Sequence, residues 1–280
     1  LDKLVDYKYR SDITNTLASF GTDHLILYKN KFFDLDHKSE IQKSIPSIFS
    51  KIVNKTSVQH LLEMLTIERP DIRYHVIKAL NKIKRKDLSL EIGSSTVRSI
   101  IKDEVHTYFK LFSIKELQPQ YGPNQILLKA LGEKIHETKE RIFRLLGLLY
   151  NPDDIYGAYL ALNSALPDKR SSTIEFLDNI ISNEDRYYIF PLIDDIEPEA
   201  KRKLGEDRFN IPEYTYDEGL NKIINGDDIW LKACALYSVS PVCPSSLQSE
   251  VKEALSSPNH LIKETAELVN KRNSNGLSSK

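Results

Sequence analysis

Glycine and cysteine are both scarce in this 280-residue chain. Only 10 residues are glycine, and they never cluster into the loop that cradles phosphates, so nucleotide-binding folds are not expected. The two cysteines, Cys234 and Cys243, have a spacing that fits neither a zinc site nor a redox pair, and their small number indicates a reducing compartment. We expect Cys234, which lies between two alanines, in the core, and Cys243 in a proline-rich loop without a basic neighbour.

The sequence also lacks an excess of either charge and a long apolar run. Lysine and arginine number 39 against 40 acidic residues, a balance that disfavours nucleic acid as a partner but leaves room for a local basic patch. The most apolar run, residues 142–150, is interrupted by Arg144 and Gly147 and is far shorter than a membrane span of about 18 residues. We therefore expect these residues to be soluble. The chain starts at Leu1 within a polar, helix-like pattern, and we expect it to be a piece of a longer protein.

Three segments align without gaps when an aspartate is taken as the start of each, namely Asp71, Asp168 and Asp227. The positions six, nine and twelve residues later are apolar in every copy: Ile77, Leu80 and Ile83; Ile174, Leu177 and Ile180; Ala233, Leu236 and Val239. A spacing of three keeps these side chains on one side of an α-helix. We expect each aspartate to cap its helix, with Pro70 and Pro167 ending the element before it.

Looser copies of this helix follow Asp36 and Pro258, and a partial copy opens the chain. Shorter helical patterns precede several copies, as at residues 58–65, 155–162 and 247–255, so the copies form antiparallel helix hairpins. A single hairpin cannot bury its apolar stripe, and neighbouring hairpins must therefore stack. The pattern predicts an all-α fold, a HEAT- or armadillo-like α-α superhelix with two layers.

The copies are unevenly spaced because longer helical patterns, residues 94–114 and 124–150, lie between two blocks of repeats. We expect them to form an inserted long helix pair, joined by a loop that is rich in proline and glycine. The predicted organisation is a single solenoid over residues 1–280, with N-terminal repeats at 1–90, the helix pair at 91–150 and C-terminal repeats at 151–280. The polar stretch 197–217 is expected to be an exposed, irregular excursion.

Residues with catalytic or metal-binding chemistry do not form a recognisable site in the sequence. Paired aspartates at 153–154, 194–195 and 227–228 are expected to serve helix ends. The pair His136–Glu137 lacks the second histidine of a zinc-protease helix, and neither a nucleophile elbow nor a P-loop occurs. We therefore predict a protein that is not an enzyme, without catalytic, cofactor-binding or metal-binding residues.

A basic cluster at residues 78–86 is the most suggestive surface feature. With Ile77, Leu80 and Ile83 turned inward, Lys78, Lys82 and Arg85 fall on the opposite face of the same helix. One explanation is a solvated helix end, where the helix dipole favours cations. The other is contact with an acidic partner or with lipid headgroups.

Two sequence blocks, residues 72–83 and residues 140–156 with 175–181, carry more information than the repeat pattern. They resemble the HEAT-repeat region that follows the membrane domain in bacterial major-facilitator proteins related to ATP/ADP translocases, a resemblance that covers most of residues 36–196. The resemblance implies a cytoplasmic scaffold at the inner membrane. Its partner would be another protein or an adjacent domain of the same chain. In that family the adjacent domains are the membrane domain and, often, a cyclic-nucleotide-binding domain. This sequence contains neither of those domains, so the family's activity transfers to no residue here.

Other functions stay open at this point. A stand-alone HEAT-like enzyme of the DNA glycosylase or lyase type would need a basic, aromatic-lined surface with a carboxylate, which the single Trp230 and the balanced charge disfavour. An independent soluble scaffold fits the repeats without the family. A module that senses cyclic nucleotides is the weakest alternative, because a glycine-rich phosphate cradle is missing.

Overall fold

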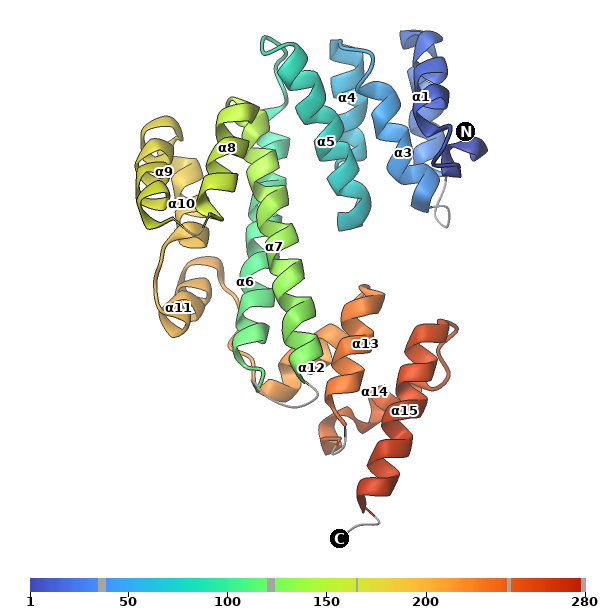
Figure 1. Ribbon diagram of the computed structural model, residues 1–280, viewed down its shortest axis with the longest axis vertical. Helices are drawn as coiled ribbons and strands as arrows, with labels where there is room; N and C mark the ends of the chain where they lie inside the picture. Colours follow the sequence, from blue (N-terminus) through green and yellow to red (C-terminus); the bar gives the residue numbers. More distant parts are fainter. Residues whose placement is uncertain (35–38, 120–123, 165, 241–242, 278–280) are drawn as a thin grey trace. The chain divides into compact units, whose positions relative to one another are not determined.

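A computed structural model describes residues 1–34, 39–119, 124–164, 166–240 and 243–277. These residues contain fifteen α-helices and no strand, which confirms the predicted all-α class (Figure 1). The helices are α1 (Arg10–Ser19), α2 (Leu25–Phe33), α3 (Ser39–Phe49), α4 (Lys55–Met64), α5 (Pro70–Lys86), α6 (Ser94–Glu116), α7 (Asn124–Leu149), α8 (Pro152–Leu162), α9 (Pro167–Ile180), α10 (Asn183–Ile193), α11 (Pro198–Phe209), α12 (Tyr216–Ile224), α13 (Ile229–Ser238), α14 (Gln248–Ala254) and α15 (His260–Leu277).

The chain divides into two compact units. The first unit combines residues 1–105 with 139–193, and the second unit combines residues 106–138 with 194–280. Two of the three boundaries between the stretches fall inside α6 and α7, whose bounds lie close to the two long helical patterns of the sequence, and the third follows α10. The single solenoid over residues 1–280 stays a prediction, and each unit is described by itself.

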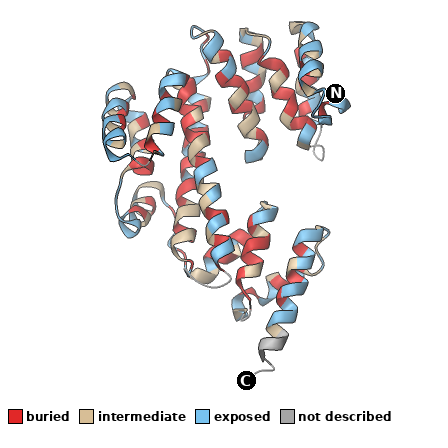
Figure 2. Ribbon diagram, in the orientation of Figure 1, coloured by how far each residue is buried: buried red, intermediate tan, exposed pale blue. Residues whose placement is uncertain are grey.

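In the first unit, successive helices pack in two rows. α3 lies between α1 and α5 and packs on both in one row (Figure 1), and α2 packs on α4 in the other row. Contacts of α2 with α3 and of α4 with α5 join the rows. The apolar positions predicted on α5, Ile77, Leu80 and Ile83, have no exposed surface, and Figure 2 shows buried residues along the facing sides of these helices. Further along, α5 packs on α8 and α8 packs on α9.

The predicted helix starts need a correction. Pro70 and Pro167 are the first residues of α5 and α9, and the side chains of Asp71 and Asp168, the second residues, do not cap these helices. Proline suits this position because its fixed φ is helical and its missing N–H would have had no partner. At α13 the cap is Asp228, which accepts a hydrogen bond from Leu231 N–H at 2.9 Å. The predicted start at Asp36 lies outside the described residues.

In the second unit, α13 packs on α12 and on α15, and α14 packs on α15. The prediction of an irregular excursion at residues 197–217 is wrong, because α11 occupies much of it. Its contact surface is glycine rather than an apolar stripe: Gly205 lies against Phe109, whose ring stacks on Phe209 at 4.9 Å between centroids. A helix that packs through glycine and aromatic rings leaves little apolar periodicity in the sequence.

Within the described ranges, none of the helices combines the length and the apolar character needed to cross a bilayer.

Candidate functional site

The three basic residues predicted to face a partner all lie on α5, but their surroundings differ. Lys78 is half-buried, with its Nζ 5.2 Å from the centre of the Tyr74 ring, whereas Lys82 and Arg85 are exposed. Arg85 Nε donates to Asp153 Oδ1 of α8 at 2.6 Å, so its charge is already paired. The structure therefore separates Arg85 from the other two cations.

Lys82 is surrounded by positive charge. Its pKa is lowered from the ordinary value by burial and then by Lys78, Lys51 and Lys86, with no carboxylate acting in the other direction. Among the residues that the structure describes, Lys51, Lys78 and Lys82 form no ion pair, and Lys86 Nζ donates only to the carbonyl of Ser50, at 3.3 Å. We call these four residues, Lys51, Lys78, Lys82 and Lys86, the lysine cluster.

Helix geometry and helix packing together assemble the lysine cluster. Lys78, Lys82 and Lys86 are spaced four residues apart and so share one face of α5. Lys51 follows α3, and the packing of α3 on α5 brings this segment close to the C-terminal half of α5, as the Lys86–Ser50 hydrogen bond shows. Sequence reasoning found Lys78 and Lys82, but it missed Lys51 because no sequence signal reports contact between two helices.

The N-terminal half of α5 is different, because its charges are balanced. Lys43 Nζ lies 3.2 Å from both Glu40 Oε1 and Asp71 Oδ2, and Arg69 lies 3.4 Å from the same Asp71 oxygen. Burial would raise the pKa of Asp71, but the hydrogen bond from Lys43 and the nearby cations lower it overall. Unbalanced positive charge on α5 is thus confined to its C-terminal half.

A junction of α5 with α7 and α8 holds α5 in place beside the lysine cluster. Tyr74 Oη donates to Glu140 Oε1 at 3.0 Å, and Arg144, which donates to the same oxygen at 2.8 Å, lies over the rings of Tyr74 and Tyr156. Asn81, buried on α5, donates from Nδ2 to the Arg144 carbonyl at 2.9 Å. Most of these contacts join the two sequence blocks, residues 72–83 and 140–156, to each other.

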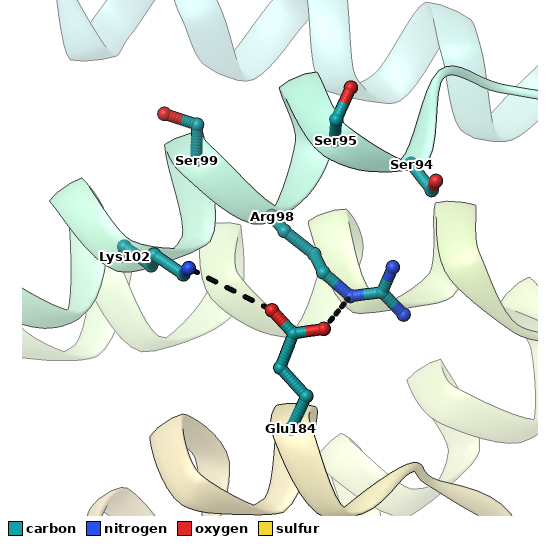
Figure 3. Close-up of a pocket in the computed structure, with 6 residues that line it drawn as sticks. All are labelled: Ser94, Ser95, Arg98, Ser99, Lys102 and Glu184. Atoms are coloured by element: carbon teal, nitrogen blue, oxygen red, sulfur yellow. Dashed lines mark ion pairs between the residues drawn. The ribbon is translucent and has the colours of Figure 1, made fainter.

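A second place of interest is a shallow groove of about 340 Å³ at the start of α6 (Figure 3). It is lined by Ser94, Ser95, Arg98, Ser99, Lys102 and Glu184. Arg98 Nε and Lys102 Nζ lie 3.4 Å and 3.7 Å from Glu184, and Arg98 also forms a two-pronged contact with Asp185 at 3.0 Å for each bond. Both cations are therefore engaged in fastening α6 to α10, and the groove has the features of a structural contact.

The remaining sequence candidates take structural positions. Asn151 caps α8 by accepting from the N–H groups of Asp153 and Asp154, so these aspartates occupy the first turn without capping it. Asp228 pairs with Lys134 at 3.0 Å, and residues 194–195 lie between α10 and α11. Across the described ranges, no three histidine, cysteine, aspartate or glutamate side chains come together as they would around a metal ion.

The two cysteines are unreactive in character. Cys234 is buried in α13, and burial raises the pKa of its thiol to about 11. Burial also raises the pKa of Cys243, which is half-buried in a loop. A thiol with a raised pKa stays protonated at neutral pH and is a poor nucleophile.

Comparison with known proteins adds no functional information. No family model, no curated protein and no solved structure matches the chain.

Proposed function

We propose that this chain is a non-catalytic, HEAT-like scaffold that binds a protein partner on the helix row α1, α3 and α5. The observation that carries the proposal is the lysine cluster, four cations on this row that form no ion pair with any described carboxylate. Grouped like charges oppose folding, and proteins retain such unfavourable groupings mainly where function requires them. A partner that supplies the missing negative charge accounts for the arrangement.

The packing of helices supports the scaffold class. In repeat proteins, stacked helix hairpins bury a continuous core and present one row of helices as an extended binding surface. The first unit has the necessary features, because α1, α3 and α5 pack in succession while α2 and α4 cover them from one side. Within this row, Lys78, Lys82 and Lys86 share one face of α5, and Lys51 follows α3.

The resemblance of residues 72–83 and 140–156 supports a location. We infer that the chain is the cytoplasmic region of a larger bacterial membrane protein similar to nucleotide transporters, at the inner membrane. The partner is then a separate protein or an adjacent domain of the same chain, and the transported nucleotide does not contact these residues.

Site-specific photo-crosslinking in the source cells tests the scaffold. A photoreactive phenylalanine analogue replaces Lys82, and the matched control carries it at Gln59, an exposed position on α4 in the opposite row. We expect a crosslinked protein product from position 82 and none from position 59. Identical product patterns at the two positions, or no product at position 82, would contradict a binding surface on α5.

A further inference from the structure

We propose that the ligand of the lysine cluster is an acidic segment of a protein, whose carboxylates pair with Lys78, Lys82 and Lys86 along α5 and with Lys51 beside them. This inference rests on the proposed function and specifies the chemistry of the partner. It follows from the spacing of the lysines, the engagement of the neighbouring arginines and the half-buried position of Lys78.

The spacing fits a linear array of carboxylates. Four residues of an α-helix rise by about 6 Å, so the three lysines of α5 repeat at that interval over about 12 Å. Glutamates four apart on a helix repeat at the same interval, and alternate residues of an extended strand repeat at about 6.6 Å. A short acidic segment in either conformation can therefore pair with several lysines at once.

Nucleic acid fits this surface less well. Arginine forks are the usual readers of phosphates and bases, but Arg85 is paired with Asp153 and Arg144 with Glu140. Single-stranded nucleic acid is commonly held by stacking on aromatic rings, yet Lys78 and Arg144 already lie over the Tyr74 ring.

A membrane surface fits less well for a different reason. Lys78 is half-buried against Tyr74, whereas Lys51, Lys82 and Lys86 are exposed. The lysines therefore differ in how far they project, whereas a flat layer of lipid headgroups is best met by side chains that all project freely. A peptide segment can follow the surface between α3 and α5.

Peptide binding by the full chain tests the proposal directly. The probe is a fluorescein-labelled peptide of twelve residues that alternates glutamate with serine, and its partner probe has glutamine in place of glutamate. Fluorescence anisotropy at low ionic strength compares the wild-type chain with Lys78→Gln/Lys82→Gln/Lys86→Gln. The matched control removes three exposed lysines of the second unit, Lys252→Gln/Lys263→Gln/Lys271→Gln, and so changes the net charge equally.

We expect the glutamate peptide to bind the wild-type chain and the control variant alike, and the cluster variant at least about tenfold more weakly. The glutamine peptide should not bind, and added salt should weaken binding because the charges lie near the surface. Equal binding by the two variants overturns the proposal. The proposal is also overturned if a twelve-nucleotide oligothymidine, or vesicles containing phosphatidylserine, bind the wild-type chain more tightly than the glutamate peptide does and lose this binding in the cluster variant.

The thermal stability of the free protein gives a second test, because the proposal and the solvated helix end predict opposite effects of replacing Lys82. If Lys82 is held among like charges for a ligand, Lys82→Gln relieves their repulsion and should raise the thermal midpoint of the free protein. If the helix dipole stabilises the Lys82 cation instead, the substitution should lower the midpoint, and that result counts against the proposal. If a protein is crosslinked at position 82 but both variants bind the peptide equally, the proposed acidic ligand is wrong and the proposed scaffold function still stands.

Discussion

Lys82 and Asp185 represent opposite ways of placing a charge on this protein. Asp185 is 2% exposed, and burial alone would raise its pKa, but hydrogen bonds from Arg98, Tyr150 and Ser182 lower it overall. Its carboxylate thus ties α6, the end of α7 and the start of α10 together. Lys82 is exposed and receives no such support, so its charge is available to another molecule.

His75, one turn before the lysine cluster, makes stability depend on pH. Its pKa is lowered below the ordinary 6.5 by burial and by the cations Lys78 and Lys43, which outweigh Glu40 and Asp71. The folded protein therefore takes up a proton less readily than the unfolded chain. The contribution of neutral His75 to the stability of the folded protein is therefore complete above pH 6.5 and is lost as the pH falls from there towards the folded-state pKa.

We expect the free energy of unfolding in urea to decrease between pH 7.5 and pH 5.5, and to decrease less in His75→Gln. The substitution removes a group that resists protonation only in the folded state. His260, whose side chain is 86% exposed, provides the control, and His260→Gln should keep the wild-type dependence. Parallel curves for the wild type and His75→Gln would show that His75 is not the source.

At the scale of the helices, glycine sets how closely α11 approaches α6. A Cβ atom on Gly205 would lie 2.9 Å from Cδ1 and 3.3 Å from Cβ of Phe109, a side chain with no exposed surface. A contact of 2.9 Å requires movement, and the stacked Phe209 ring restricts where Phe109 can go. The close approach of α11 to α6 at this point therefore requires a residue without a side chain.

Gly205→Ala should lower the free energy of unfolding by about 1 kcal/mol, because strain of about 2 kcal/mol from overpacking exceeds a gain of about 1 kcal/mol in helix propensity. The matched substitution Gly132→Ala lies in α7 of the same unit, where no atom lies within 4 Å of the added Cβ. It should raise stability by roughly 0.5–1 kcal/mol. Urea unfolding compares the two variants, and an equal gain in both would refute the close contact.

The sequence predicts helices well where one face is apolar. On α5 the period that places Ile77 and Leu80 inward is strong, and both are fully buried. On α11 the same reasoning fails, because the buried residues of this helix are Lys201 and Gly205, neither of which signals a core. A local pattern reports burial only when burial is achieved by apolar side chains.

The candidate site was accessible to sequence reasoning only in part. The spacing of Lys78 and Lys82 follows from the helix period, but the pairing of Arg85 with Asp153 and the approach of Lys51 depend on tertiary packing. Sequence reasoning therefore located a basic helix face without showing which of its charges are free. The same limit applies to Asp185 and Arg98, which are far apart in the sequence and meet only in the fold.

At the scale of the whole molecule, the proposed location makes a prediction about the native protein. An antibody to this chain should detect, in fractionated source cells, a band much larger than 32.2 kDa that stays with the membranes after a carbonate wash. Carbonate removes peripheral proteins, so retention indicates a covalent link to a membrane domain. A soluble band near 32 kDa would instead support an independent scaffold that is not linked to a transporter.

The boundaries inside α6 and α7 bear on how this protein can be divided. Because each unit is made of two separate stretches of chain, one interleaved with the other, no single truncation yields either unit intact. Isolating the first unit requires excision of residues 106–138 with a new connection from residue 105 to 139, together with removal of everything after 193. A library of simple terminal deletions would leave fragments with exposed apolar surface, and their insolubility would say nothing about the stability of either unit.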